Sequence, residues 1–211
     1  MFLQKLYHFL TKNWKFSYRS SDVKDQFKRA NRIICISAHS TTFLDGILLH
    51  EALKSLGVYN HIIYVKGLFG FIPSWCKEIT NDSFLSNEIK LLNSQDSFCR
   101  VFFPSGGNVK WKTGFYVLAK ETNSMIVVIG IDYKTKTVQI DSLFYTDEDY
   151  CQIKTKAIIE LKKYQANLFY ILWRILFGYG CETYDISPFI LQWSRLFLGG
   201  SCLFTLLYLC F

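Results

Sequence analysis

The stretch from Arg32 to Asp45 constrains the fold of this chain more than any other. It opens with Arg32-Ile33-Ile34-Cys35-Ile36, an apolar and branched run that predicts a strand buried on both faces. From Phe43 to Leu56 the apolar residues recur at helical spacing, with polar residues on the opposite side. A buried strand that passes directly into an amphipathic helix is typical of an α/β sheet.

Two residues suited to acid–base chemistry lie at this junction. His39 follows the end of the strand, and Asp45 falls in the first turn or two of the helix. In an open α/β sheet, ligands bind in the crevice beyond the strand ends. A carboxylate there can fix one imidazole tautomer, so that the other ring nitrogen accepts a proton. The simpler explanation is that the helix dipole favours Asp45 and that backbone groups satisfy His39.

Further strand-like and helix-like segments alternate along the chain. They predict a mostly parallel sheet flanked by helices, in which the last expected strand, residues 137–141, pairs beside the strand at residues 125–132. The expected strands are residues 61–66, 99–103, 125–132 and 137–141, and the expected helices are residues 20–31, 83–94 and 147–164, with another that begins near Lys110.

Charge and cysteine content narrow the class of protein. The net charge of +7 suits an anionic partner, either a membrane surface or a phosphorylated substrate. Nucleic acid is not expected, because the chain has no long Lys/Arg run and no helix-turn-helix pattern. The seven cysteines form no Cys-x-x-Cys pair, which indicates reduced thiols in a cytosolic compartment and no metal site.

The two ends of the chain are the most apolar parts. Residues 1–20 predict an amphipathic helix, which either lies in a membrane interface or packs on its own domain. Residues 167–211 predict hydrophobic helices at the membrane, with an uncharged run from Leu196 to Phe211. We therefore expect an α/β domain over residues 21–166 between hydrophobic helices at both termini, on the cytosolic face of an intracellular or plasma membrane.

A candidate anion-binding loop follows the strand at residues 99–103. Its sequence is Pro104-Ser105-Gly106-Gly107-Asn108, and two adjacent glycines free the backbone to turn its N–H groups toward an anion. The next helix begins close to Lys110 and Lys112, which places two ammonium groups near its positive end. Most Gly-Gly pairs are ordinary turns, and this one is not a P-loop.

Together these stretches resemble the glycerolipid acyltransferase superfamily, typified by the lysophosphatidate acyltransferases. The similarity covers roughly residues 30–145 and is clearest in three segments, which are Phe103 to Asn108, Trp111 to Lys120 and Ile126 to Tyr133. The resemblance implies an α/β fold and transfer of an acyl group from acyl-CoA or acyl carrier protein, with no further cofactor. The family's paired His and Asp are matched in type by His39 and Asp45.

The chain departs from the family pattern at four points. Five residues rather than four separate His39 from Asp45, and Met125 replaces the proline that opens the fourth motif. Ser105-Gly106-Gly107-Asn108 stands where the family carries Glu-Gly-Thr-Arg, and the second-motif Arg has no clear equivalent. In place of an Arg, a flexible lysine is expected to contact the acceptor. The expected acceptor-binding residues are Ser105, Gly106, Gly107, Asn108, Lys110, Lys112 and Lys66.

Three functions are consistent with these residues. The first is a membrane-bound O-acyltransferase that uses His39 as general base on a glycerolipid or lysophospholipid hydroxyl. The second is a catalytically impaired, lipid-binding membrane scaffold, which the altered third motif favours and the His39–Asp45 pair opposes. The third is a serine hydrolase that uses Ser105 with His39, although Ser105 lacks the Gly-x-Ser-x-Gly context. The oligomeric state cannot be inferred from these residues.

Overall fold

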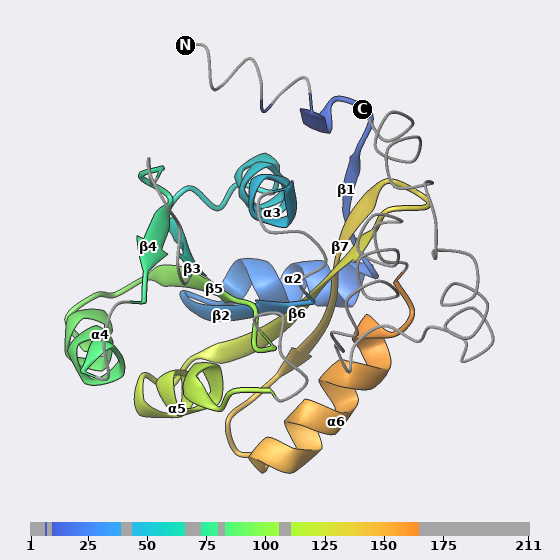
Figure 1. Cartoon of the computed structure of the whole chain (residues 1–211). Coiled ribbons are helices and arrows are strands. Elements are labelled where there is room, and N and C mark those ends of the chain that lie inside the picture. The colour runs from blue at the N-terminus through green and yellow to red at the C-terminus, as the bar shows by residue number, and fades with distance from the viewer. Residues whose placement is uncertain are drawn as a thin grey trace, which may run out of the picture.

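The computed structural model describes residue 7 and residues 10–38, 44–65, 73–79, 83–105 and 111–164. These ranges hold seven strands and five helices (Figure 1). In chain order they are β1 (Lys15–Tyr18), α2 (Ser21–Arg29), β2 (Arg32–Ser37), α3 (Leu44–Ser55), β3 (His61–Val65), β4 (Cys76–Glu78), α4 (Phe84–Asn93), β5 (Phe98–Phe102), α5 (Gly114–Glu121), β6 (Met125–Asp132), β7 (Thr137–Phe144) and α6 (Tyr150–Leu161).

All seven strands form one mixed and mostly parallel sheet. The strand order is β1-β7-β6-β2-β5-β3-β4, and β2 lies near its centre. Strands β2 to β6 run parallel to one another, whereas β7 is antiparallel to β6 and β1 is parallel to β7. The expectation of a mostly parallel α/β sheet is therefore confirmed, and β7 pairs beside β6 as predicted.

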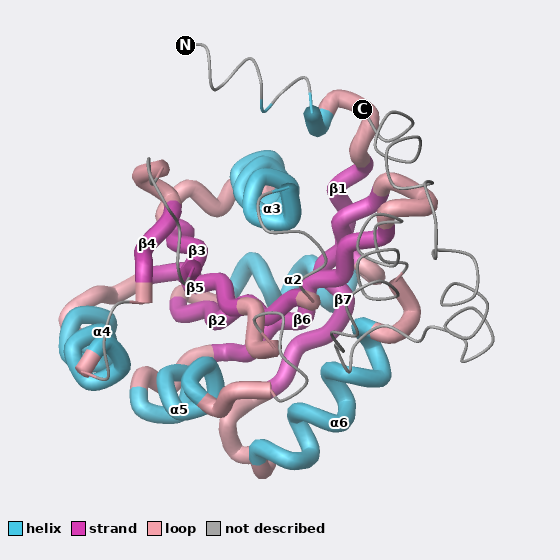
Figure 2. The backbone as a smooth tube through the Cα atoms, viewed as in Figure 1, coloured by secondary structure: helices cyan, strands magenta, loops and turns pink. Residues whose placement is uncertain are grey.

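Helices cover both faces of the sheet, with α3 on one side and α4, α5 and α6 on the other (Figure 2). Alternate side chains of β2 point to opposite faces of the sheet. Ile34 and Ile36 pack with α4, α5 and α6, while Ile33 and Cys35 pack with α2 and α3. Because both faces of β2 are covered, its sequence is continuously apolar rather than alternating. The prediction of a strand buried on both faces is confirmed.

The amino-terminal segment differs from the predicted helix. Residues Lys15–Tyr18 form the edge strand β1, so the helix expected over residues 1–20 is wrong for this part. Trp14, Phe16 and Tyr18 all pack against the apolar layer between the sheet and helices α2 and α3. These side chains repeat with a period of two, which suits a strand. Pairing with β7 outweighs the helical pattern that Trp14 shares with earlier residues.

The expected membrane helices require a correction. Within the described ranges, no helix is long and apolar enough to cross a membrane. The fold class of the described residues is therefore an α/β sheet with covering helices, without the terminal hydrophobic helices that we expected at the membrane. Residues 168–211, on which the carboxyl-terminal part of that expectation rested, lie outside the described residues.

Candidate functional site

The structure describes only part of the predicted site. Asp45, Ser105 and Lys112 lie in the described ranges. The geometry of the expected His39–Asp45 pair is thus not part of the structure, and neither is that of the Gly-Gly turn. The predicted residues outside the described ranges are His39, Lys66, Gly106, Gly107, Asn108 and Lys110.

Asp45 occupies a position suited to acid–base chemistry. It lies in the first turn of α3, the helix that follows the central strand β2, and its side chain is fully buried. The Tyr133 hydroxyl donates a hydrogen bond to Oδ1 of Asp45. A buried carboxylate is costly unless hydrogen bonds and nearby positive charge stabilise it. The amino end of α3 supplies positive potential and Tyr133 supplies one hydrogen bond.

Tyr133 and Trp14 are not among the predicted site residues. Tyr133 directly follows β6, the strand beside β2, and its ring meets Trp14 edge to face at a centroid distance of 5.2 Å. Trp14 directly precedes β1, which runs antiparallel to β6. Both aromatic rings therefore lie where the parallel strands have their carboxyl ends, which we call the carboxyl edge of the sheet. The sequence could have indicated Tyr133 by its position, because it directly follows the buried strand β6 at the end of the sheet where Asp45 lies.

The predicted acceptor loop leaves the sheet at this edge too. Ile36 of β2 pairs with both Phe102 of β5 and Val128 of β6, so β2 and β5 end side by side and β6 continues past them to Asp132. After β5, Ser105 is buried, and the Lys112 amide donates a hydrogen bond to the Pro104 carbonyl at 3.0 Å. The two ends of the loop are therefore close together, and the Lys112 side chain is exposed.

A histidine pair that the sequence analysis did not predict lies between α3 and β3. Nδ1 of His50 is 2.8 Å from Nε2 of His61, and Nδ1 of His61 is 2.8 Å from the Val58 carbonyl. A carbonyl only accepts, so His61 donates to Val58 and accepts from His50. The His50 ring also stacks on Trp75 at 4.6 Å. This arrangement suits two neutral imidazoles that join α3 to β3.

The histidine pair makes stability depend on pH. Burial, then the neighbouring His61 and Lys54, lower the pKa of His50 from 6.5 to about 4. Between these values the unfolded chain binds more protons than the folded one, so the free energy of unfolding decreases as the pH falls from 6.5 toward 4. We expect a loss on the order of 2 kcal/mol, measurable by urea denaturation across this range. In His50→Gln the free energy of unfolding should depend less on pH over this range. If it falls as steeply as in the wild type, His50 is not the group responsible.

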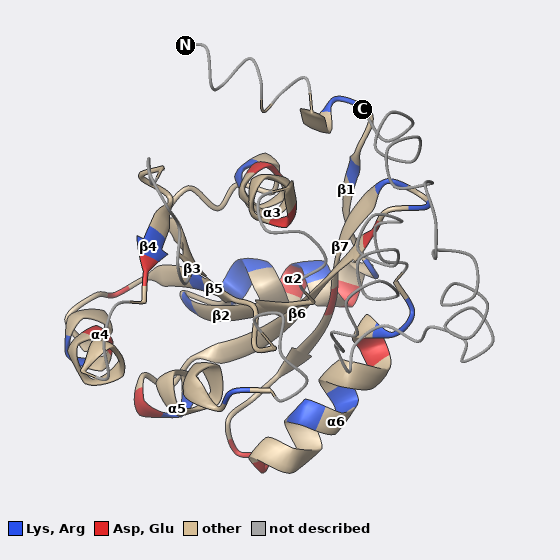
Figure 3. Ribbon diagram, viewed as in Figure 1, with Lys and Arg blue, Asp and Glu red and all other residues tan. Residues whose placement is uncertain are grey.

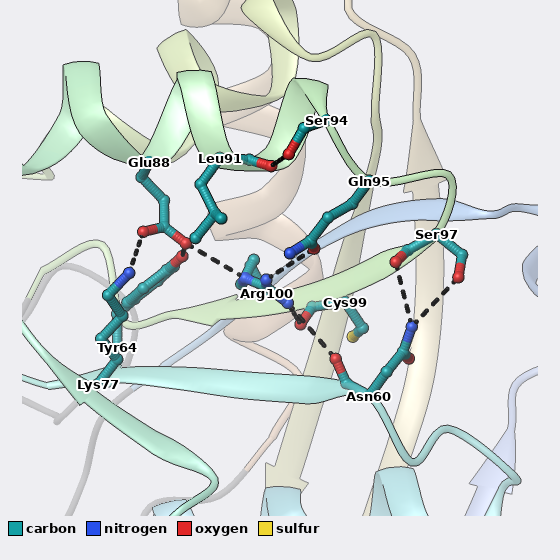
Figure 4. Close-up of polar contacts among 10 residues, drawn as sticks. All are labelled: Asn60, Tyr64, Lys77, Glu88, Leu91, Ser94, Gln95, Ser97, Cys99 and Arg100. Carbon is teal, nitrogen blue, oxygen red and sulfur yellow. Dashed lines mark hydrogen bonds and ion pairs between the residues drawn. The ribbon is translucent and has the colours of Figure 1, made fainter.

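A second polar cluster lies under α4, on the other face of the sheet (Figure 4). Glu88 of α4 is buried and accepts hydrogen bonds from Tyr64 of β3 and Lys77 of β4. Nε of the buried Arg100 in β5 lies 3.4 Å from Oε1 of Glu88. The remaining guanidinium nitrogens donate to Gln95 and to two backbone carbonyls, those of Asn60 and Cys99.

This cluster is best explained as a support for the fold. Burial alone would raise the pKa of Glu88, but the hydrogen bonds from Lys77 and Tyr64 and the charge of Arg100 lower it below its ordinary value. Glu88 is therefore charged at neutral pH and compensates Arg100. Its partners come from β3, β4 and β5, so the cluster fixes α4 and the short edge strand β4 to the sheet.

An open groove of about 790 Å³ lies at the opposite edge of the sheet from Asp45. Its walls include Arg32 at the start of β2, Met125 at the start of β6 and Tyr145 just after β7. Ligands of α/β sheets usually bind at the carboxyl ends of parallel strands, whereas this groove lies at their amino ends. We therefore place the candidate site at the edge that carries Asp45 and Tyr133.

No family model, curated protein or solved structure matches this chain. The resemblance to the glycerolipid acyltransferases thus stands on the sequence segments alone. Among the described residues, no group of three or more His, Cys, Asp or Glu side chains could hold a metal ion.

Proposed function

We propose that the protein is an O-acyltransferase that moves a fatty acyl group from acyl-CoA or acyl carrier protein to a glycerolipid or lysophospholipid hydroxyl. In this proposal His39 is the general base and Asp45 orients and stabilises its imidazole. The reaction takes place at the cytosolic surface of a membrane, where the lipid acceptor resides. No cofactor is required beyond the acyl thioester itself.

The observation that carries the proposal is the buried carboxylate of Asp45. It lies at the carboxyl edge of the sheet, six positions after His39 in the chain, and Tyr133 holds its Oδ1. A buried carboxylate at the start of a helix suits the task of stabilising an imidazolium. A second contribution comes from the strands beside β2, because the matched segment Phe103 to Asn108 directly follows β5 and the matched segment Ile126 to Tyr133 spans most of β6.

The proposed reaction needs no nucleophile from the protein. His39 removes the proton from the acceptor hydroxyl while the oxygen attacks the thioester carbonyl. The carbon–sulfur bond then breaks, and the thiolate leaves with the proton that the imidazolium returns. Asp45 balances the transient positive charge on the imidazole, and Tyr133 fixes the orientation of the carboxylate.

The acceptor is expected to carry no phosphate monoester. A dianionic phosphate that is buried usually takes bidentate contacts from Arg. The loop offers the neutral groups of Ser105, Gly106, Gly107 and Asn108, with lysines only at Lys110, Lys112 and Lys66. Neutral donors suit a hydroxyl or a phosphodiester headgroup, so we propose a lysophospholipid or another neutral-headed lipid alcohol.

The test is an assay of purified protein in detergent against a panel of lysolipids and glycerol 3-phosphate, with labelled acyl-CoA or acyl carrier protein as donor. Transfer to a neutral-headed lysolipid supports the proposal. Preference for lysophosphatidate or glycerol 3-phosphate would contradict the acceptor assignment but not the reaction. Binding of lysolipid without transfer to any acceptor would instead support the impaired scaffold, which the altered third motif favours.

The Asp45–Tyr133 contact predicts a graded loss of activity. Asp45→Asn keeps the shape of the side chain but removes its charge, so kcat should decrease by about 10-fold or more while KM for both substrates stays within twofold. Tyr133→Phe removes only the hydroxyl and should decrease kcat by a smaller factor in the same direction. Steady-state kinetics measure both changes. Unchanged kcat in the two variants would show that this contact only supports the fold.

A further inference from the structure

A group of lysines lies beside the candidate site at the carboxyl edge of the sheet. We call Lys12, Lys15, Lys134 and Lys136 the basic rim. Lys12 precedes β1 and Lys15 is its first residue, while Lys134 and Lys136 lie in the turn between β6 and β7. Figure 3 shows the Lys/Arg colour at the start of β1 and on the β6–β7 turn. Residues 10–18 and 133–137, which contain the basic rim, carry no acidic residue.

Backbone contacts hold the two segments of the basic rim together. The amide of Lys15 donates to the carbonyl of Lys136 at 2.8 Å, and Lys15 pairs with Thr137 in the sheet. In the turn, Oδ1 of Asp132 accepts from the amides of Lys134 and Thr135 at 2.9 and 3.3 Å. The Asp132 carboxylate is thereby directed at the backbone of the turn, which holds the turn that carries Lys134 and Lys136 in a fixed conformation.

The charges of three lysines of the basic rim, Lys15, Lys134 and Lys136, are available to a partner. Lys15, Lys134 and Lys136 are exposed, and none of the three forms an ion pair with a described carboxylate. Two lysines in and just after α6 differ, since Lys156 pairs with Glu148 and Lys163 pairs with Glu160. Uncompensated like charges that lie close together attract an anionic surface.

The basic rim adjoins the candidate site through the aromatic pair. Lys15 directly follows Trp14 and Lys134 directly follows Tyr133, whose rings are in edge-to-face contact. Tyr133 in turn donates to the Asp45 carboxylate. A partner that binds the basic rim is therefore held at the same edge of the sheet as the proposed acyl-transfer site.

We propose that the basic rim docks the protein on an anionic lipid surface, with the candidate site facing that surface. This inference rests on the proposed function in one respect, namely that the acceptor is a membrane lipid. The three exposed lysines Lys15, Lys134 and Lys136, spread over two segments, suit many diffuse headgroup charges, whereas a single tightly held phosphate favours Arg. Docking there brings lipid hydroxyls to the edge that carries Asp45.

The test is flotation of the full-length protein with vesicles of phosphatidylcholine alone or of phosphatidylcholine with phosphatidylserine. The variant is Lys15→Gln, Lys134→Gln and Lys136→Gln together. Each lysine near an anionic surface strengthens binding about fivefold, so the triple variant should bind the mixed vesicles about 100-fold less tightly. High salt should reduce binding of the wild type in the same way. The matched control is Lys24→Gln, Lys90→Gln and Lys120→Gln, which removes three exposed lysines from α2, α4 and α5 and should bind as the wild type does.

Three outcomes would overturn the inference. The first is equal binding of wild type and rim variant to the mixed vesicles, and the second is an equal loss in the matched control. The third is a higher KM of the rim variant for acyl-CoA with a detergent-dispersed acceptor, because the lysines would then bind the donor phosphates. Since flotation needs no catalysis, it tests docking even if no acyl transfer is found. If the protein transfers acyl groups but the rim variant floats as well as the wild type, the docking proposal is rejected and the proposed function stands.

Discussion

Replacing His39 by alanine is expected to lower the rate of acyl transfer by about 100-fold or more, the range found when a general base is removed. The loss should appear in kcat, because the hydroxyl loses the group that accepts its proton in the transition state. The free energy of unfolding should change by less than about 1 kcal/mol. Steady-state kinetics with the preferred lysolipid and urea denaturation measure the two quantities.

The matched control is His50→Gln, which alters a histidine of α3 that lies in the His50–His61 pair rather than in the proposed site. At neutral pH this variant should keep the wild-type rate. A His39→Ala protein that retains more than half of the activity would reject the proposed mechanism. A His39→Ala protein that unfolds would instead support the simpler explanation, in which backbone groups satisfy His39 as part of the fold.

The core of the fold could be predicted because its strands carry the strongest local signals. The run from Met125 to Asp132 is apolar throughout, and β6 occupies those residues. Helix α6 is shorter than the predicted residues 147–164, because the Asp149 side chain caps its amino end by accepting from the Cys151 amide. Strands such as β6 are buried on both faces, so their continuous apolar sequence can be recognised without knowing which strands lie beside them.

The edge strands could not be predicted in this way. Strand β4 has three residues, all half-buried, and β1 has four. Segments so short have almost no periodicity of their own, and their conformation depends on pairing with β3 and β7. Residues 10–14 also share a helical pattern that competes with the strand. Tertiary pairing, which the local pattern does not contain, decides between the two.

The candidate site could be predicted in position but not in its contacts. Asp45 was identified from its place after a strand, and the structure confirms that it begins a helix at the edge of the sheet. Its partner Tyr133 is 88 positions away and becomes adjacent only because β6 lies beside β2. The His50–His61 pair and the Glu88 cluster were missed for the same reason, since each joins several elements.

The largest effect on stability is expected at Glu88. Glu88→Leu removes the buried carboxylate that Arg100 and Tyr64 contact, and leaves a buried guanidinium without its counter-charge. Loss of one partner of a buried ion pair costs about 3–5 kcal/mol, a large share of the stability of a typical domain. Urea denaturation at neutral pH should show this decrease in the free energy of unfolding.

Two further variants separate an uncompensated charge from lost packing. Lys77→Met removes the partly exposed cation of the cluster and should cost less than about 1 kcal/mol, as surface ion pairs do. Glu88→Leu combined with Arg100→Met removes both buried charges, so it should restore more than half of the stability lost in Glu88→Leu. If the two losses simply added, Glu88 and Arg100 would contribute independently, and α4 would be held mainly by its apolar contacts.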